Sequence, residues 1–191
     1  ISDIEGAPTR VRRDLQLEKE NANKVLDDCP TLLRVDSENM EWAFAELDDC
    51  LNVMLEIEPL RDAGQIVMEY PKGERLRITG KVGLSNMSLA IRKDRDWFDI
   101  NGKVQVNENL VIELRQLLEL TAKKKGPFVE ISDGQFIALT NQFRQKLDEL
   151  SNLIFKTKDQ LRFHPLAAHA IEDFTWQLQE VELDLAWKKH V

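Results

Sequence analysis

The sequence has no uninterrupted run of 18 apolar residues, so we predict no membrane-crossing segment and expect no membrane partner. It does not begin with methionine. Residues 1–6 are neither basic nor continuously apolar, so we do not expect them to be a secretory signal peptide. The missing initiator methionine leads us to expect a piece excised from a larger protein.

Cysteine is scarce. Cys29 and Cys50 are the only two in 191 residues, too few for a zinc site and typical of a reduced, cytoplasmic protein. A domain of this length buries roughly 70% of its unfolded surface and needs no disulfide or metal to fold. We therefore expect a cytoplasmic protein held together by its hydrophobic core.

The common catalytic motifs are missing. A phosphate-binding loop needs Gly-x-x-x-x-Gly-Lys followed by Ser or Thr, but Gly80-Lys81 precedes Val82 and Gly102-Lys103 precedes Val104. Gly-x-Ser-x-Gly is absent as well. We assign no catalytic, cofactor-binding or metal-binding residue, and we do not expect this chain to be an enzyme by itself.

Two clusters of metal-ligand side chains have simpler interpretations. The first is the pair His169 and Glu172, which share a predicted helical face five residues after His164. A metal site normally needs at least three protein ligands, and the helical spacing suggests no third one for this pair. The second is Asp94, Asp96 and Asp99, around Trp97. It could bind a divalent cation, but Arg92 and Arg95 favour surface ion pairs with these acids.

Charge is unevenly spread over a chain whose formal net charge is −8. Residues 1–70 carry 7 basic and 17 acidic groups, a net charge of −10. Residues 71–95 carry 7 basic and 2 acidic groups, a net charge of +5, and residues 96–191 carry 12 and 15, a net charge of −3. The total argues against a protein coated in nucleic acid, but one segment is locally basic.

Periodicity predicts helices over about 9–28 and 40–60, followed by strands at 65–70, 75–82 and 87–93. The strands alternate as a half-solvated antiparallel sheet with a basic outer face does. Its cations, Arg75, Arg77, Lys81 and Arg92, could follow the phosphates of double-stranded DNA. The alternative is that they only keep a solvated face soluble, and exposed aromatics for base stacking are missing from the predicted face.

Residues 97–154 contain an apparent repeat. Residues 97–106 predict a hairpin closed by Asn101-Gly102, and residues 128–139 a second one closed by Asp133-Gly134. Each runs into a leucine-rich helix, and the apolar positions of the two helices match at an offset of 33 residues. We predict two tandem hairpin–helix units.

A long C-terminal helix is predicted from Pro165 onward, because apolar residues recur at intervals of 4-3-4-3-4 up to Leu185. Trp176, Leu183 and Trp187 form a second apolar stripe almost opposite the first. Its aromatic composition suits an interface, so these three residues are candidates for docking onto a motor domain. The alternative is that the helix is sandwiched within this chain's own core.

The predicted fold class is α+β: a mainly antiparallel sheet with two tandem hairpin–helix units, N-terminal helices and a long C-terminal helix. The predicted division is an N-terminal helical segment (1–64), an α+β accessory domain (65–155), and a connector with a long helix (156–191).

Several blocks carry a resemblance to a known family. They are Glu-Tyr-Pro-Lys-Gly-Glu-Arg-Leu at 69–76, Asp-Trp-Phe-Asp-Ile-Asn-Gly at 96–102, the leucine-rich stretch at 110–120, and the 128–140 block with its Asp-Gly-Gln-Phe core. In this order they resemble the region just before the motor of bacterial Swi/Snf-type (DEAD/DEAH-box-like) helicases. Tyr70 stands where that family tends to have Trp, and the end around Trp187 looks like the entry to its ATPase core.

The resemblance implies a parent that hydrolyses ATP, with Mg²⁺, to translocate on double-stranded DNA. Its Walker lysine, its acidic pair and its arginine finger would lie beyond Val191, and no catalytic residue transfers to this chain. The resemblance thus implies a non-catalytic accessory domain that regulates the downstream ATPase core of the same polypeptide or contacts DNA. The alternative is a free-standing α+β protein-interaction module with no motor.

Overall fold

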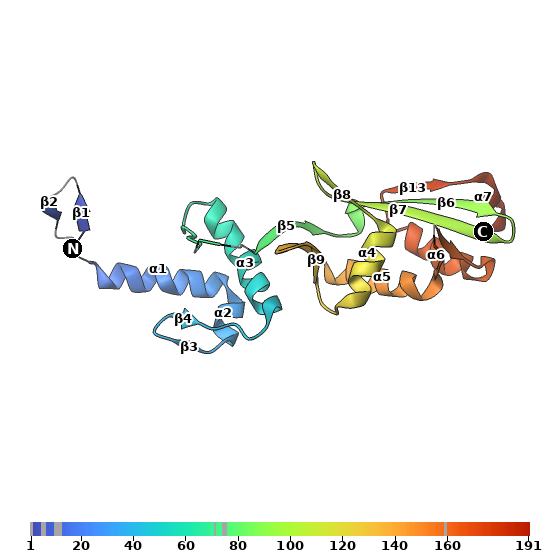
Figure 1. The fold of residues 1–191 in the computed structure, drawn as a ribbon. Helices are drawn as coiled ribbons and strands as arrows, with labels where there is room; N and C mark the ends of the chain where they lie inside the picture. Colours follow the sequence, from blue (N-terminus) through green and yellow to red (C-terminus); the bar gives the residue numbers. More distant parts are fainter. Residues whose placement is uncertain (1, 5–6, 10–12, 71, 74–75, 159) are drawn as a thin grey trace. The chain divides into compact units, whose positions relative to one another are not determined.

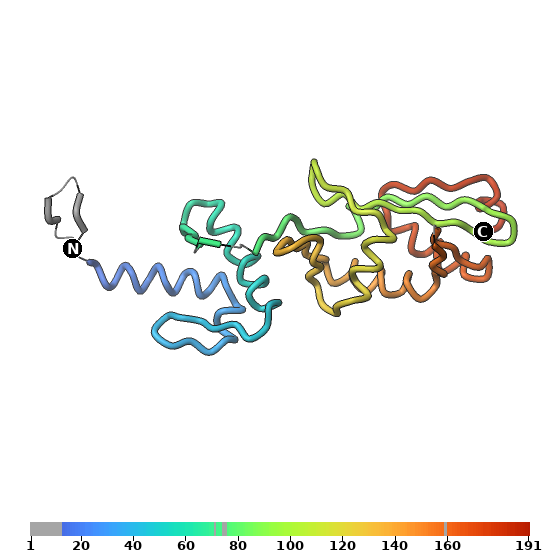
Figure 2. The backbone as a smooth tube through the Cα atoms, in the orientation of Figure 1, coloured from blue at the N-terminus to red at the C-terminus, as the bar shows by residue number. Residues whose placement is uncertain are grey.

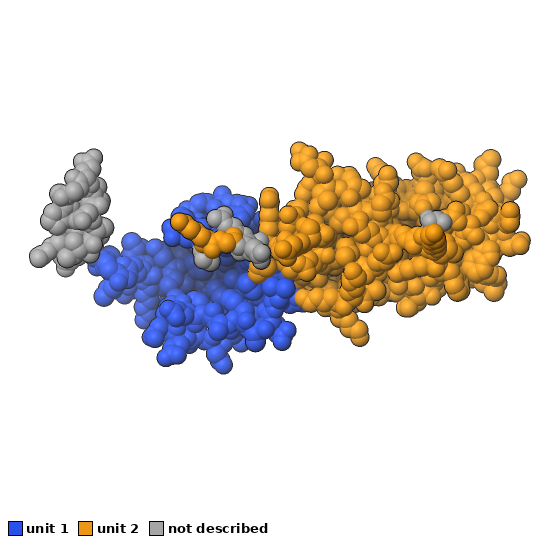
Figure 3. Space-filling view, in the orientation of Figure 1, with its two compact units in different colours: residues 1–71 blue, residues 72–191 orange. Residues whose placement is uncertain are grey.

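The computed structural model describes residues 2–4, 7–9, 13–70, 72–73, 76–158 and 160–191. The chain divides into two compact units, residues 1–71 (unit 1) and residues 72–191 (unit 2), coloured separately in Figure 3. The division into two units differs from the predicted division into three segments, because residues 156–191 share one core with the strands and helices before them. Each unit is described by itself.

Unit 1 is built mainly from helices. A two-stranded pair, β1 (Ser2–Ile4) and β2 (Ala7–Thr9), precedes α1 (Leu15–Asp28), whose first N–H groups are capped by the side chain of Asp14. Then follow α2 (Pro30–Arg34), a small hairpin of β3 (Ser37–Glu38) and β4 (Glu41–Trp42), and α3 (Leu47–Asp62). The two predicted N-terminal helices are therefore present but shorter.

The predicted strand over 65–70 is wrong, because these residues carry no regular structure. Its expected partner does form a strand, β5 (Arg77–Val82), which pairs instead with β10 (Gln135–Leu139) in parallel. On its other side β10 pairs antiparallel with β9 (Phe128–Ser132), giving a three-stranded sheet in the order β5-β10-β9. A distant strand thus replaces the local hairpin.

The larger sheet of unit 2 has six strands. They are β6 (Met87–Asp94), β7 (Trp97–Asn107), β8 (Leu110–Glu113), β11 (Phe155–Lys156), β12 (Leu161–Phe163) and β13 (Glu180–Leu183). The order is β11-β12-β7-β6-β13, with β8 also paired to β7. Only β13 runs parallel to its neighbour, and Figure 2 shows this red segment beside the green β6. The α+β class with a mainly antiparallel sheet is confirmed.

The helices of unit 2 share one core with the inner face of this sheet. They are α4 (Leu114–Lys123), α5 (Asn141–Leu153), α6 (Ala168–Thr175) and α7 (Leu185–His190), with short 3-10 turns η1 (Leu84–Asn86) and η2 (Pro165–Ala167). Figure 1 shows α5 and α6 on one side of β6, β7 and β13. Met87, Leu89 and Ile91 of β6 are buried under the helices, as their alternation predicts.

The position of the turn predicted for the first hairpin is wrong. Asn101-Gly102 lies inside the continuous strand β7, and the chain reverses at 95–96 and 108–109 instead. A Cβ on Gly102 would lie 3.1 Å from the Cβ of Leu114 and 3.1 Å from the carbonyl oxygen of Ser88. Glycine is needed there because the first turn of α4 approaches closely, not because the strand turns.

The second predicted hairpin is confirmed. Gly134, at φ 67°, closes β9 onto β10, and the hydroxyl of Thr140 caps α5 by accepting from the N–H of Phe143 at 3.2 Å. Both segments are a hairpin followed by a helix, but the hairpins belong to different sheets. Leu110, matched by spacing to a helical residue, lies in β8. The two tandem hairpin–helix units are therefore present, but the residue-by-residue match at an offset of 33 fails at Leu110.

The predicted long C-terminal helix is wrong. Helix α6 ends at Thr175, and residues 180–183 form the edge strand β13, in register with β6. The side chain of Asp184 then caps α7, accepting from the N–H of Trp187 at 2.7 Å. Residues 180–183, Glu-Val-Glu-Leu, also alternate with period two, and pairing with β6 decides between the two periods.

Candidate functional site

The four predicted DNA contacts do not share one sheet. Arg75 lies outside the described residues. Arg77 and Lys81 are exposed on β5 of the three-stranded sheet, whereas Arg92 is exposed on β6 of the six-stranded sheet. The single basic antiparallel face predicted for these strands is therefore wrong, because β5 pairs with β10 and not with β6.

The outer face of the six-stranded sheet carries a groove of about 660 Å³. Small side chains of β6, Ser88 and Ala90, lie in its middle, and its rims are acidic: Glu113 on β8, and Glu180 and Glu182 on β13. Arg92 lies 3.9 Å from the Glu182 carboxylate and Lys103 lies 3.8 Å from Glu113. This face carries both signs of charge, so it does not favour an anionic ligand.

The two described cations of β5, Arg77 and Lys81, face no charged residue across the strand ladder. Across the β5–β10 ladder, Arg77 faces Gln135 and Lys81 faces Ala138, which are both uncharged. The N–H of Arg77 donates to the carbonyl of Gly134 at 2.8 Å, which fixes the backbone at this end of the strand. Two exposed cations on a fixed strand are a suitable arrangement for contacting phosphates.

The predicted docking stripe does not exist as one surface. Trp176, at the end of α6, is 79% exposed, Leu183 on β13 is half-buried, and Trp187 on α7 is only 2% exposed. Trp187 packs edge-on against Phe98, with ring centroids 5.1 Å apart, and against Phe163 at 5.7 Å. The prediction that these residues form an exposed motor-docking face is corrected: Trp187 is core, and Trp176 alone is exposed.

The acidic cluster around Trp97 is held by a residue that the sequence did not indicate. Arg162 on β12 donates from Nε to Asp99 at 2.8 Å and from Nη2 to Asp94 at 2.5 Å. The expected partners, Arg92 and Arg95, are not the ones that bind these two acids. The carboxylates of Asp94 and Asp99 are thus both engaged by one guanidinium.

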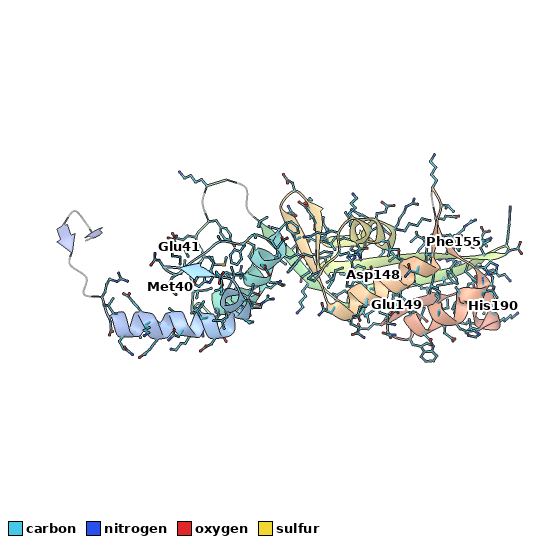
Figure 4. The ribbon with its side chains drawn as sticks, turned by 90° about the horizontal axis from the view of Figure 1, so that it is seen from below. Met40, Glu41, Asp148, Glu149, Phe155 and His190 are labelled. Carbon is cyan, nitrogen blue, oxygen red and sulfur yellow. The ribbon has the colours of Figure 1, made fainter. Side chains whose placement is uncertain are left out.

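An aromatic cluster at the same end of the sheet was also missed. Trp97 packs edge-to-face with Phe155, at 5.3 Å between centroids, and with His164 at 5.4 Å. Phe155, labelled in Figure 4, is 58% exposed on the two-residue strand β11. Only the register of β11 on β12 brings Phe155 beside Arg162, so no local signal could have found this cluster.

His164 and His169 each contact another group of this chain. His164 accepts from the N–H of Leu166 through Nδ1 at 3.2 Å and so caps η2, while His169 lies 3.8 Å from the Glu172 carboxylate on an exposed helix turn. Across the residues that the structure describes, no three His, Cys, Asp or Glu side chains are placed to hold a metal ion.

No family model, curated protein or solved structure matches this chain. Among the helices in the described ranges, none has both the length and the hydropathy that a bilayer crossing needs. The functional argument therefore rests on the residues and their arrangement.

Proposed function

We propose that this chain is a non-catalytic accessory domain of a cytoplasmic Swi/Snf-type DNA-dependent ATPase, one that regulates the motor or contacts DNA. ATP and Mg²⁺ would belong to a motor domain downstream in the same polypeptide, and no residue described above is assigned to them. The resemblance of the 96–102 and 128–140 blocks to that family gave the hypothesis. The packing of the first block supports it.

One observation carries the proposal. Phe98, from the Asp-Trp-Phe block, stacks on Phe163 at 5.4 Å between centroids and meets Trp187 edge-on. The block that carries the resemblance and the Trp187 segment, which resembles the entry to an ATPase core, are thus parts of one core. Because α7 and the sheet share this packing, we propose that a movement of α7 caused by the motor displaces the sheet.

Contact with double-stranded DNA would be made through β5. Arg77 and Lys81 are the cations that face uncharged neighbours, whereas Arg92 is shared with Glu182. Two phosphate contacts alone give weak, sequence-independent binding that falls with salt. This contact would position the module on DNA and would not select a sequence.

The product of the complete gene tests the proposal. We expect it to hydrolyse ATP in a DNA-stimulated manner, and we expect a version without residues 72–191 to change that rate at least threefold. The 191-residue chain alone should hydrolyse no ATP. A stop codon directly after Val191, or a gene product without ATPase activity, would overturn the proposal in favour of a free-standing protein-interaction module.

A further inference from the structure

Unit 1 has very little core for its size. Among its described side chains, in residues 13–70, the buried apolar ones are Cys29, Leu51 and Leu60, whereas the described part of unit 2 buries 28. Large apolar side chains lie instead on its surface, including Leu15, Leu17, Leu33, Met40, Leu47 and Val67. A helical unit of about 70 residues that leaves so much apolar surface in water is poorly stabilised unless something covers part of it.

Helix α1 is the clearest case. None of its 14 residues is buried, although it packs beside α2 and α3. A helix whose apolar side chains are at most half-buried has little of the apolar packing that usually holds helices in proteins. Part of α1 is thus available as a binding face.

A groove of about 520 Å³ shows which part of α1 this is. Its lining combines one face of α1 with the end of α3 and the residues after it: Asn21, Ala22, Lys24, Val25, Leu60, Gln65 and Ile66. Leu17 lies one turn before Asn21 on the same face and is 53% exposed, and Val67, next to Ile66, is 87% exposed. The apolar strip thus continues beyond the groove at both places.

The net charge of unit 1 favours a basic occupant. Residues 1–70 carry a net charge of −10, and Glu18 and Asp28 lie one turn from Ala22 and Lys24 along the groove face of α1. Lys24 is a cation on the lining, and Arg13 pairs with Glu18. An acidic unit of this kind repels nucleic acid and repels a second copy of itself, whereas it attracts a basic protein segment.

We propose that the α1–α3 groove of unit 1 binds a basic amphipathic helix of a partner protein. Apolar side chains of that helix at positions i, i+3 or i+4, and i+7 would fill the strip from Leu17 to Ile66. Lysine or arginine on its flanks would face the carboxylates of α1. The site lies in unit 1 and involves neither β5 nor any ATPase, so it stands independently of the function proposed above.

The test uses the whole 191-residue chain and synthetic peptides. The probe is a 15-residue helical peptide of leucine and lysine, with its leucines on one face. Two matched peptides serve as controls: one with glutamate for lysine, and one with the same composition in an order that destroys the apolar face. Titration calorimetry at 150 mM NaCl should show one-to-one binding of the first peptide and binding at least 30-fold weaker for either control peptide.

Variants locate the binding. Val25→Ser and Ile66→Ser should each weaken binding of the leucine–lysine peptide about tenfold, whereas Leu33→Ser, which removes an exposed leucine of α2 outside the groove, should change it less than twofold. Should a serine variant unfold, the unaltered chain still gives the answer, because the amide NMR signals of Asn21, Lys24 and Gln65 should shift on titration. Equal weakening by Leu33→Ser, equal binding of the disordered-face peptide, or unshifted groove signals would each overturn the proposal.

Discussion

Arg162 and Asp99 are joined across neighbouring strands by a hydrogen-bonded ion pair of 2.8 Å between Nε and Oδ1. The two side chains are 27% and 17% exposed, which places the pair between a surface salt bridge and a buried one. Asp94 shares the same guanidinium. One cation therefore ties the β6–β7 hairpin to β12, the strand whose Phe163 packs on Phe98.

The first prediction is that Arg162→Ala lowers the free energy of unfolding of unit 2 by about 1–3 kcal/mol. The change destabilises the protein because it leaves two carboxylates without their cation. The expected loss lies between those for exposed and for buried ion pairs, since these side chains are partly buried. Urea denaturation followed by circular dichroism measures it. Arg92→Ala is the control: its pair with Glu182 is exposed and 3.9 Å long, so it should change stability by less than about 0.5 kcal/mol.

The second prediction concerns Asp184, which joins α7 to β6. Its carboxylate accepts from the N–H of Lys93 at 2.7 Å and from that of Trp187 at 2.7 Å. Asp184→Ala should lower stability by about 0.5–2 kcal/mol, the usual effect of losing a helix N-cap. Asp184→Asn should retain much of the stabilisation that the N-cap provides, because asparagine also caps helices well.

The same bonds make this contribution depend on pH. The N–H groups of Lys93 and then Trp187 hold the pKa of the Asp184 carboxyl below its ordinary value. A lowered pKa in the folded state means that the contribution is complete above the unfolded pKa of about 3.9 and is lost as the pH falls through the folded one. Between pH 5 and pH 2, Asp184→Asn should therefore lose less stability than the unaltered chain. Identical slopes would contradict this assignment.

The third prediction separates two tryptophans that sequence spacing placed together. Trp187→Ala should destabilise unit 2 by about 3–5 kcal/mol, because it empties a core position against the edges of the stacked rings of Phe98 and Phe163. Trp176→Ala should change stability by less than about 0.5 kcal/mol, since that side chain is 79% exposed. Thermal unfolding measures both, and a large loss from Trp176→Ala would mean that it is covered in solution.

The fourth prediction tests the DNA contact proposed for β5. Reversing both charges, Arg77→Glu with Lys81→Glu, should lower affinity for a fluorescent DNA duplex and reduce the slope of log affinity against log salt by about two units. Fluorescence anisotropy between 50 and 200 mM NaCl measures this. Arg92→Glu is the matched control and should leave the slope within half a unit. An unchanged slope in the double variant would remove β5 from the DNA contact.

Local patterns predicted the parts of the fold that local forces decide. The alternation of Met87, Leu89 and Ile91 identified β6 and its buried face, and Asp133-Gly134 identified a real turn because glycine takes a positive φ there. Asn101-Gly102 carries the same local signal but sits inside β7, where contact with Leu114 requires the glycine. From the sequence alone, a glycine required for a turn with positive φ looks the same as one required by a close contact.

The surroundings of the candidate site residues depend more on contacts between residues that are far apart in the sequence. The 4-3-4-3-4 spacing up to Leu185 fits a helix, but β6 offers an open edge to residues 180–183, and a strand forms there. This one change breaks the docking stripe and brings Glu180 and Glu182 beside Arg92, so the basic face becomes a mixed one. Arg162, 63 residues from Asp99 in sequence, could not be paired with it before the strand order was known.

The fifth prediction is that unit 1 opens before unit 2, and its cysteines can report this. Both cysteines lie in unit 1, so alkylation measures that unit alone. Burial raises the pKa of the Cys29 thiol, with Glu56 and Asp28 adding to the effect, and Cys29 has no exposed surface. Folded Cys29 should therefore react slowly with iodoacetamide at pH 7.5, since the thiolate is the reactive form.

The Cys50→Ser variant leaves Cys29 as the single thiol for this measurement. Among the described residues, unit 1 has three buried apolar side chains and unit 2 has 28, so unit 1 has much less hydrophobic stabilisation. Cys29 should therefore become reactive at a urea concentration at least 1 M below the unfolding midpoint of unit 2. The unfolding midpoint of unit 2 is measured by the fluorescence of Trp187. For this purpose the other tryptophans are removed by Trp42→Phe, Trp97→Phe and Trp176→Phe. The Cys29 signal should also move to higher urea when the leucine–lysine peptide is bound, because a ligand of the folded state stabilises it. If Cys29 labelling and Trp187 fluorescence change at the same urea concentration, the two units unfold together and the small core of unit 1 is not its weak point.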